Sequence, residues 1–257
     1  MPYENIDIKK EFYNHFILNM NKENFMPFFY EIFVYGTAYV VGGYFRDFIN
    51  KKQSRDIDII VEINNDLLME IIKNAKINYT INRHGGIKLM HNNLQMDIWN
   101  LENNWAFKNN LVKFNEDDKV NSIAKGCFYN YDALAINLHN FSYSLRFYTE
   151  CIETGKLNIL QEGSLYKNLN PTTEANILRA FFLKDNLGIS FTKNTFDYLS
   201  KKVGYLEDKY GNDFFNKLLE VKSNYPKYGN LSSEKLKKYI LELKTTDLPN
   251  NQMIIDF

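Results

Sequence analysis

The sequence predicts an α+β fold in which a small mixed sheet with flanking helices is followed by a mainly helical domain. Three observations support this prediction. Apolar residues recur at helical spacing over residues 6–33. Short apolar runs that alternate with polar residues or end in turn signals fill residues 34–115 and are typical of strands. Beyond the polar connector at 115–119 the spacing is mainly helical again. We therefore expect an N-terminal helical segment (1–33), a sheet domain (34–115) and a helical domain (116–257).

The first predicted strand ends in a pair of glycines. Residues 38–41 are apolar, and Gly42 and Gly43 follow directly. Glycine lets the backbone approach a ligand closely, and the N–H groups that open the next helix favour an anion. Arg46 lies one helical turn beyond Gly43, so its guanidinium can face the same ligand. A glycine pair alone is a weak signal, because most such pairs are only turns.

The next predicted strand carries two acidic residues on one face. It reads Asp-Ile-Asp-Ile-Ile-Val from Asp56 onward, and residues two apart in a strand share a face. The carboxylates of Asp56 and Asp58 repel each other unless a cation lies between them. Mg²⁺ prefers oxygen ligands and is usually bound by one or two carboxylates together with substrate phosphates. The alternative interpretation is a charged strand that faces solvent.

A third carboxylate follows on a predicted hairpin. Residues 86–91 and 94–99 read as two strands joined by a tight turn. Asp97 alternates with apolar neighbours, so it faces away from the core. Sites with two metal ions use carboxylates from more than one element. Three acids of one alternation class therefore favour a metal site over solvated strand residues.

The helical domain contains three predicted helical features. The run Pro171-Thr172-Thr173-Glu174 is a start signal for a helix that ends near Gly188. Residues 214–219 form an apolar stripe, and a last helix runs from Ser232 to about Leu243.

The glycine turn and the Asp-x-Asp strand resemble the nucleotidyltransferases of the DNA polymerase beta superfamily. Within it they are most similar to the head domain of poly(A) polymerases and tRNA CCA-adding enzymes. That family has an apolar strand, Gly-Gly, two residues, Arg-Asp and then Asp-x-Asp, which here stand at 41–47 and 56–58. The match is specific over residues 38–62 and weaker over about 35–200. It implies a sheet of five strands or fewer, a helical neck, and metal-dependent transfer of a nucleoside monophosphate from a triphosphate.

The resemblance also implies roles for individual residues. The expected contacts to the nucleoside triphosphate are Gly42, Gly43, Arg46 and Arg179. The expected ligands of Mg²⁺, with two ions, are the catalytic residues Asp56, Asp58 and Asp97. Asp97 would hold the ion that activates the acceptor oxygen and is also a candidate base.

Two departures from the family concern its substrate. The family's Arg-Arg-Asp should fall at 126–128, where this chain has Gly-Cys-Phe. Lys125 could supply a point charge if the alignment shifts by one residue, but not a forked donor. The Glu-Asp-x-x-Arg element that reads the incoming base should fall at 172–176, which reads Thr-Thr-Glu-Ala-Asn. We therefore expect the transfer chemistry without CCA template specificity.

A further pattern joins the hairpin to two tryptophans. It comprises Gly-Gly-Ile-Lys-Leu at 85–89, Met-Asp-Ile-Trp at 96–99 and Trp105. It is similar to a less familiar bacterial branch of the same head-domain group. We interpret Trp99 and Trp105 as core aromatics rather than platforms for base stacking.

Charge limits the expected partners. Lys and Arg number 31, as do Asp and Glu, so the formal net charge is zero. Proteins that hold long nucleic acids usually carry a basic excess. Residues 193–244 contain eleven Lys and seven acids, a local charge of +4 (eleven minus seven). This allows a short RNA end as partner and argues against an extended RNA track; the alternative is a set of solvated helix faces.

Cysteine content and hydropathy indicate the compartment. Cys127 and Cys151 are too few for a disulfide framework, which favours a reducing cytosol. The sequence shows no signal peptide and no apolar run long enough to span a membrane. We expect a cytoplasmic protein without a membrane partner.

Three functional hypotheses follow. The leading one is a Mg²⁺-dependent nucleotidyltransferase that modifies an acceptor hydroxyl, with an RNA (tRNA) 3′ end as the expected acceptor, in RNA maturation or as a toxin or defence enzyme. The second is a small-molecule or protein nucleotidyltransferase. The third is an inactive nucleotide-binding regulatory module, against which the three acids argue. The nucleotide, the number of additions and the oligomeric state stay open.

Overall fold

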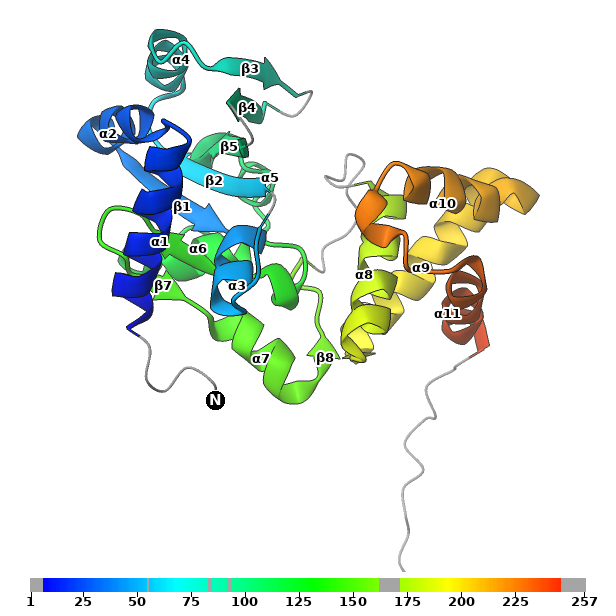
Figure 1. Cartoon of the computed structure of the whole chain (residues 1–257). Coiled ribbons are helices and arrows are strands. Elements are labelled where there is room, and N and C mark those ends of the chain that lie inside the picture. The colour runs from blue at the N-terminus through cyan, green and yellow to red at the C-terminus, as the bar shows by residue number, and fades with distance from the viewer. Residues whose placement is uncertain (1–6, 55, 83–84, 92–93, 162–171, 246–257) are drawn as a thin grey trace, which may run out of the picture. The chain divides into compact units, whose positions relative to one another are not determined.

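The chain divides into two units. A computed structural model describes residues 7–54, 56–82, 85–91, 94–161 and 172–245. The first unit is Met1–Glu153 and the second is Thr154–Phe257 (Figure 1).

The first unit contains the sheet. Its strands are β1 (Thr37–Val41), β2 (Asp56–Glu62), β3 (Asn78–Ile81), β4 (Ile87–His91), β5 (Leu94–Asn100), β6 (Ala135–Asn137) and β7 (Tyr143–Ser144). Its helices are α1 (Ile8–Lys22), α2 (Met26–Tyr35), α3 (Gly43–Ile49), α4 (Asn65–Asn74), α5 (Trp105–Lys108), α6 (Lys119–Lys125) and α7 (Arg146–Thr154), with the 3-10 turns η1 (Leu101–Asn103), η2 (Glu116–Asp118) and η3 (Asn130–Asp132).

The sheet is mixed, which confirms the α+β prediction. Its seven described strands lie in the order β3-β4-β5-β2-β1-β6-β7. Strands β2 and β5 are parallel, and the other neighbouring pairs are antiparallel. The family resemblance implied five strands or fewer. The sheet is larger because β6 and β7 extend it beyond β1, and β3 extends it beyond β4.

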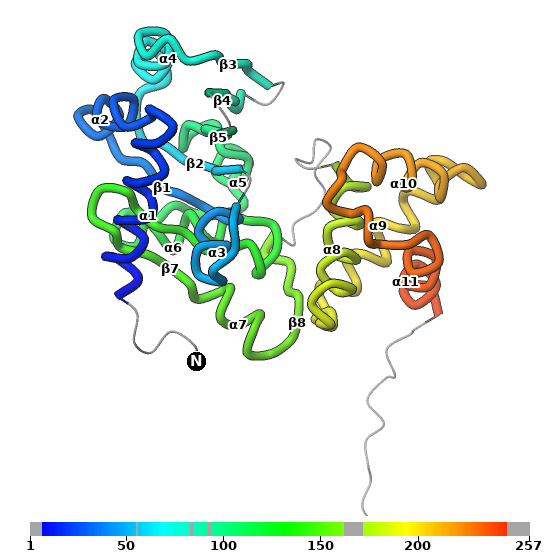
Figure 2. Tube along the Cα trace, viewed as in Figure 1, coloured from blue at the N-terminus to red at the C-terminus, as the bar shows by residue number. Residues whose placement is uncertain are grey.

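Aromatic side chains pack the N-terminal helices against α3. Phe12 of α1 lies edge-on to Phe45 of α3, with ring centroids 5.1 Å apart, and both rings are fully buried. Phe16 meets Phe29 of α2 at the same centroid distance. The expected helical segment is two helices, because Asn24 takes a φ of 57° between them. These helices lie beside the sheet in the tube view (Figure 2).

Helix α6 covers part of the sheet face that carries the acids. Val120 and Ile123 of α6 pack on Tyr39 of β1 and Ile60 of β2. Trp99 packs against the same cluster, as a core aromatic would. Because side chains alternate along β2, Ile60 and Asp58 share this face. Apolar packing thus closes one end of the face and leaves the acids at the other.

The first unit extends past the polar connector that we expected to end the sheet domain. Strand β6 pairs with β1 in the register Val41–Ala135, Val40–Ile136 and Tyr39–Asn137. Backbone groups of a buried strand must be hydrogen-bonded, so the three buried residues of β6 complete the far side of β1.

The second unit is mainly helical. It contains α8 (Thr173–Leu187), α9 (Lys193–Tyr210), α10 (Phe214–Ser223) and α11 (Ser233–Thr245), the parallel pair β8 (Lys156–Leu157) and β9 (Ser190–Phe191), and the turns η4 (Gly211–Asp213) and η5 (Pro226–Tyr228).

Local capping and one cross-contact explain the helices of this unit. Thr172 caps α8 by accepting a hydrogen bond from the backbone of Ala175, and Gly188 ends it with a φ of +65°. Asp185 of α8 binds Lys235 at 2.8 Å and accepts a hydrogen bond from Tyr239 at 2.9 Å, which fixes α11. The predicted helix from Thr172 to Gly188 and the last helix are confirmed.

None of the described helices combines the length and apolar character needed to cross a membrane.

Candidate active site

The three predicted acids lie on adjacent strands of the sheet. Asp58 of β2 is the register partner of Asp97 on β5, and Asp56 is the partner of Gln95. Neighbouring strands are about 4.8 Å apart, and register partners project from the same face. The fold therefore places two of the acids side by side and the third two residues along the same strand face.

Asp97 has a half-buried carboxylate with two partners. The Lys88 ammonium lies 3.8 Å from Oδ1, and the Gln95 amide donates to Oδ2 at 3.4 Å. Burial raises the pKa of Asp97 above its usual range, while Lys88 and Gln95 oppose that shift. The charge of Asp56 adds to the rise. The two carboxylates are thus close enough to repel each other.

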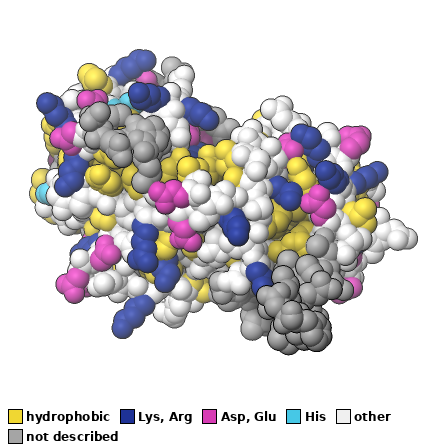
Figure 3. Space-filling model, turned by 90° about the horizontal axis from the view of Figure 1, so that it is seen from below, with side chains coloured by type: hydrophobic (Ala, Val, Ile, Leu, Met, Phe, Trp, Pro, Cys, Tyr) yellow, Lys and Arg dark blue, Asp and Glu magenta, His cyan; other side chains and the backbone are white. Residues whose placement is uncertain are grey.

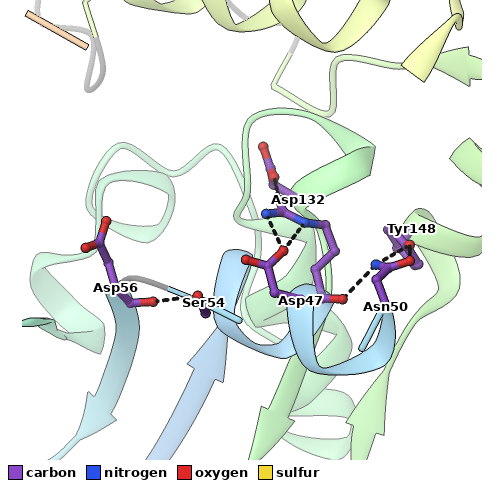
Figure 4. Close-up of polar contacts among 7 residues, drawn as sticks. Asp47, Asn50, Ser54, Asp56, Asp132 and Tyr148 are labelled. Carbon is purple, nitrogen blue, oxygen red and sulfur yellow. Dashed lines mark hydrogen bonds and ion pairs between the residues drawn. The ribbon is translucent and has the colours of Figure 1, made fainter. Parts of the chain in front are cut away.

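The start of β2 is fixed by a serine. The Ser54 hydroxyl donates to the backbone oxygen of Asp56 at 3.2 Å (Figure 4). The side chain of Asp56 points away from that contact in the same view. Ser54 therefore contacts the backbone of Asp56 rather than its carboxylate.

The glycine turn connects β1 to α3. Gly42 has a φ of +66°, which an L side chain rarely adopts, and its N–H donates to the Leu134 carbonyl at 3.0 Å. Its own carbonyl accepts the first helical hydrogen bond, from Arg46 N–H at 3.0 Å. Gly43 then begins α3, and a Cβ there would meet Arg46 Nη2 at 3.7 Å.

Arg46 lies between two carboxylates. Its Nε and Nη2 donate to one oxygen of Asp47 at 3.1 and 2.9 Å, and its Nη1 pairs with Asp132 (Figure 4). The guanidinium also lies 4.9 Å from the ring centre of Tyr131. We predicted that Arg46 faces the triphosphate. The structure shows that its fork joins α3 to η3, so a phosphate would have to share it with Asp47 and Asp132.

A second set of contacts fixes the C-terminal end of α3. Asn50, which caps the end of α3, donates to the Arg46 carbonyl at 2.7 Å and to the Tyr148 hydroxyl at 2.9 Å (Figure 4). Tyr148 lies on α7, so residues about a hundred positions apart in sequence fix the helix that carries Arg46.

Cys127 occupies the region where the resembling family has its arginine pair. Burial raises the pKa of the Cys127 thiol, and the charges of Asp132 and Asp58 raise it further. The thiol is therefore neutral and adds no positive charge beside the acids. Lys125, the expected substitute, is exposed at the end of α6.

Arg179 and the expected base-reading segment lie in the second unit, on α8. Glu174 is buried and accepts a hydrogen bond from the Tyr210 hydroxyl at 3.0 Å. Asn176 is also buried. The role of Arg179 as a triphosphate contact stays a prediction.

The acids do not form a ready-made metal cage. Within the described ranges, no three His, Cys, Asp or Glu side chains are grouped so that they could hold a metal ion. The donor chemistry still fits Mg²⁺, which commonly takes only one or two protein carboxylates and completes its shell with substrate phosphates and water. The charge of Asp56 raises the pKa of Asp97, and a cation near the two carboxylates would relieve their repulsion. Such an ion would be held by one or two carboxylates from the set Asp56, Asp58 and Asp97, together with a nucleotide.

Sequence reasoning assigned no role to Asp132 or Lys88. Asp132 stands in the Tyr-Asp-Ala-Leu-Ala run at 131–135 and lies 86 residues beyond Arg46, so local spacing does not link the two. Lys88 stands in the pattern at 85–89, but only the strand register shows that it neighbours Asp97.

Comparisons with known proteins agree with this geometry. The family model described as Poly A polymerase head domain matches residues 38–125. No curated protein sequence matches the chain.

Among solved structures, a CCA-adding enzyme in complex with CTP is 22% identical with a TM-score of 0.58, over 82% of this chain and 48% of that one. The Thermotoga maritima CCA-adding enzyme complexed with tRNA is 20% identical with a TM-score of 0.57, over 81% and 47%. A tRNA-processing enzyme with CTP is 19% identical with a TM-score of 0.54, over 81% and 54%.

The chain thus spans about half the length of these structures. Their likeness shows a shared fold, and the family model covers the segment that holds the glycine turn and all three acids. Residues 38–125 therefore match the Poly A polymerase head domain model, and the solved structures share the fold of this chain.

Proposed function

We propose that this protein is a Mg²⁺-dependent nucleotidyltransferase that moves a nucleoside monophosphate from a nucleoside triphosphate to the hydroxyl of an RNA 3′ end, with tRNA as the preferred class. The observation that carries the proposal is the register of β2 with β5, which sets Asp58 beside Asp97 next to the Gly42-Gly43 turn. The register of β1 with β2 sets Val41, which precedes the turn, opposite Asp58.

Nucleotidyl transfer requires a proton acceptor, a backbone that the phosphates can approach, and a metal site. The acceptor oxygen forms a bond to the α-phosphorus, the bond between the α-phosphorus and its bridging oxygen to the β-phosphate breaks, and pyrophosphate leaves. Asp97, whose pKa is raised by burial, would take the hydroxyl proton. Gly42 and Gly43 let the phosphates approach the backbone. Asp56 and Asp58 would hold Mg²⁺, which would offset the negative charge that develops on the phosphates during transfer.

Several features support nucleotidyl transfer without the residues that read the incoming base in the resembling family. The segment at 172–176 lacks the Asp and Arg of the base-reading element. Glu174, the acid present there, is occupied by Tyr210. Neither Thr172, which caps α8, nor Glu174 offers a forked donor for a base edge. We therefore propose transfer without CCA selection, which would suit maturation of an RNA end or a toxin or defence enzyme.

Surface charge favours a short RNA end. On the face shown in Figure 3, Lys and Arg side chains are scattered among Asp and Glu. Lysines of the second unit pair with acids of the same unit, including Lys217 with Glu220 and Lys235 with Asp185, both at 2.8 Å. Paired lysines release fewer counterions when they meet RNA, so they contribute little to binding of a long strand.

The test is transfer from each of four α-labelled NTPs, with Mg²⁺, to tRNA, to a protein mixture and to no macromolecule. Labelled tRNA is the expected result. Label in protein or in a small molecule would favour the second hypothesis. Equal, background labelling by wild type and by the Asp56→Ala/Asp58→Ala variant would show that the chain is not a nucleotidyltransferase.

A further inference from the structure

We propose that Lys88 is the residue that binds the acceptor, through a phosphate of its terminal nucleotides, and so positions the 3′ hydroxyl beside Asp97. This inference rests on the proposed function and specifies which side of the site receives the RNA.

The strand register places Lys88 in the row of the acids. Lys88 of β4 is the partner of Asp97 on β5, which in turn is the partner of Asp58 on β2. Register partners project from one face, so the three side chains form a line across the sheet. Because neighbouring strands are about 4.8 Å apart, the Cα atom of Lys88 lies about 10 Å from the Cα atom of Asp58.

That line has a triphosphate side and an opposite side. The Gly42-Gly43 turn follows β1, which neighbours β2 and lies beyond Asp58. Lys88 lies at the other end, beyond Asp97 and next to the edge strand β3, whose four residues are all exposed. A group that enters from the β3 edge reaches Lys88 first, then Asp97. This is the order that an acceptor would follow.

The Lys88 ammonium can donate hydrogen bonds to a further ligand. Its distance of 3.8 Å to Asp97 is long for an ion pair, and its side chain is 40% exposed. To the residues that the structure describes, Lys88 makes no side-chain hydrogen bond. An ammonium carries three donors, so an anion can bind Lys88 while Asp97 stays beside it. Arg46, in contrast, already gives its fork to Asp47 and Asp132.

The chemical class of the ligand follows from the site. A partly exposed ammonium acts as a point charge for a phosphate rather than as a reader of base edges. The acceptor is therefore recognised here through its backbone, without base specificity at this contact. That mode agrees with the missing template residues at 172–176.

The experiment compares Lys88→Ala, Lys88→Arg and the matched surface control Lys73→Ala, with a 12-nucleotide RNA acceptor. Each enzyme is assayed with the natural RNA and with the same RNA carrying a neutral methylphosphonate at its last or next-to-last linkage. Loss of one charge-assisted hydrogen bond should raise the KM for RNA about tenfold. Lys88→Ala should therefore raise the KM for RNA and leave the KM for NTP unchanged. Lys88→Arg should restore most of the loss, and Lys73→Ala should behave as wild type.

The neutral linkage separates this role from a structural one. In wild type, one of the two methylphosphonates should weaken RNA binding about tenfold, whereas in Lys88→Ala neither should add to the loss. Additive effects, or an unchanged KM for RNA in Lys88→Ala, would overturn the assignment and leave the proposed function standing. No transfer to RNA by wild type would contradict the proposed function itself, and the assignment of Lys88 with it.

Discussion

Asp58 on β2 and Asp97 on β5 are register partners in a parallel pair of strands, so two carboxylates from segments 39 residues apart lie side by side on one sheet face. Parallel neighbours need a long crossover connection, and here α4 and the β3–β4 pair provide it. Burial and the charge of Asp56, two residues before Asp58 on the same strand, both raise the pKa of Asp97. This arrangement leads to predictions that can be tested separately.

Asp97→Asn should abolish transfer without lowering stability when metal is absent. Burial raises the pKa of Asp97, so the folded state binds this proton more tightly than the unfolded state does. The ionised carboxylate therefore weakens folding, and stability falls as the pH rises through that raised pKa. Urea unfolding at pH 7 in EDTA should show the variant at least as stable as wild type. A clear loss of stability would mean that the Lys88 and Gln95 contacts outweigh burial.

Asp132→Ala should destabilise the first unit by about 2 kcal/mol, because it leaves the partly buried Arg46 with one carboxylate fewer. Asp132→Asn keeps an oxygen acceptor and should have about half that effect. Urea unfolding of both variants measures this, with the exposed Asp117→Ala as control. If all three unfold like wild type, the link between α3 and η3 does not stabilise the domain.

The two glycines should respond differently to alanine. Gly42 has a φ of +66°, so Gly42→Ala should cost about 1–2 kcal/mol of stability. Gly43 is helical and a Cβ there meets Arg46 at an ordinary 3.7 Å, so Gly43→Ala should change stability by less than about 1 kcal/mol. If phosphates approach this backbone, Gly43→Ala should still raise the KM for NTP. Thermal unfolding and steady-state kinetics distinguish the two effects, and an unchanged KM in Gly43→Ala would argue against phosphate binding at the turn.

His15 should make folding sensitive to mild acid. It packs against Tyr44 and Phe48 and lies 3.1 Å from the Asn19 amide. Burial lowers its pKa below the ordinary value of 6.5. The unfolded chain therefore takes up this proton first, and stability falls as the pH drops below about 6.5 towards the folded pKa. His15→Gln should flatten the unfolding free energy between pH 7.5 and 5.5; parallel curves for the two proteins would rule out this origin.

Local patterns were enough to predict the central elements. Alternation placed Asp56 and Asp58 on one strand face and Asp97 on a hairpin strand, and the structure has β2 and the β4–β5 pair at those positions. Capping residues likewise predicted α8 and α11. These features depend on residues within a few positions of each other, which a sequence shows directly.

Contacts between distant segments were beyond such patterns. The pairing of β6 with β1 joins residues about a hundred positions apart, and all three residues of β6 are buried, so no alternation marks it. The ion pair between Arg46 and Asp132 spans 86 residues. Strand β3 is exposed along its whole length and therefore has no apolar face to reveal it. The neighbourhood of Lys88 and Asp97 likewise depends on a register that only the folded sheet defines.

The central claim is that the Asp56, Asp58 and Asp97 face transfers a nucleotide. The most direct measurement is the rate of transfer of labelled NMP to tRNA by wild type and by Asp58→Asn, each with Mg²⁺ and with EDTA. We predict transfer by wild type only with Mg²⁺, and a rate at least about 100-fold lower in a variant that folds normally. Equal rates for the folded variant and wild type, or wild-type transfer that persists in EDTA, would contradict it.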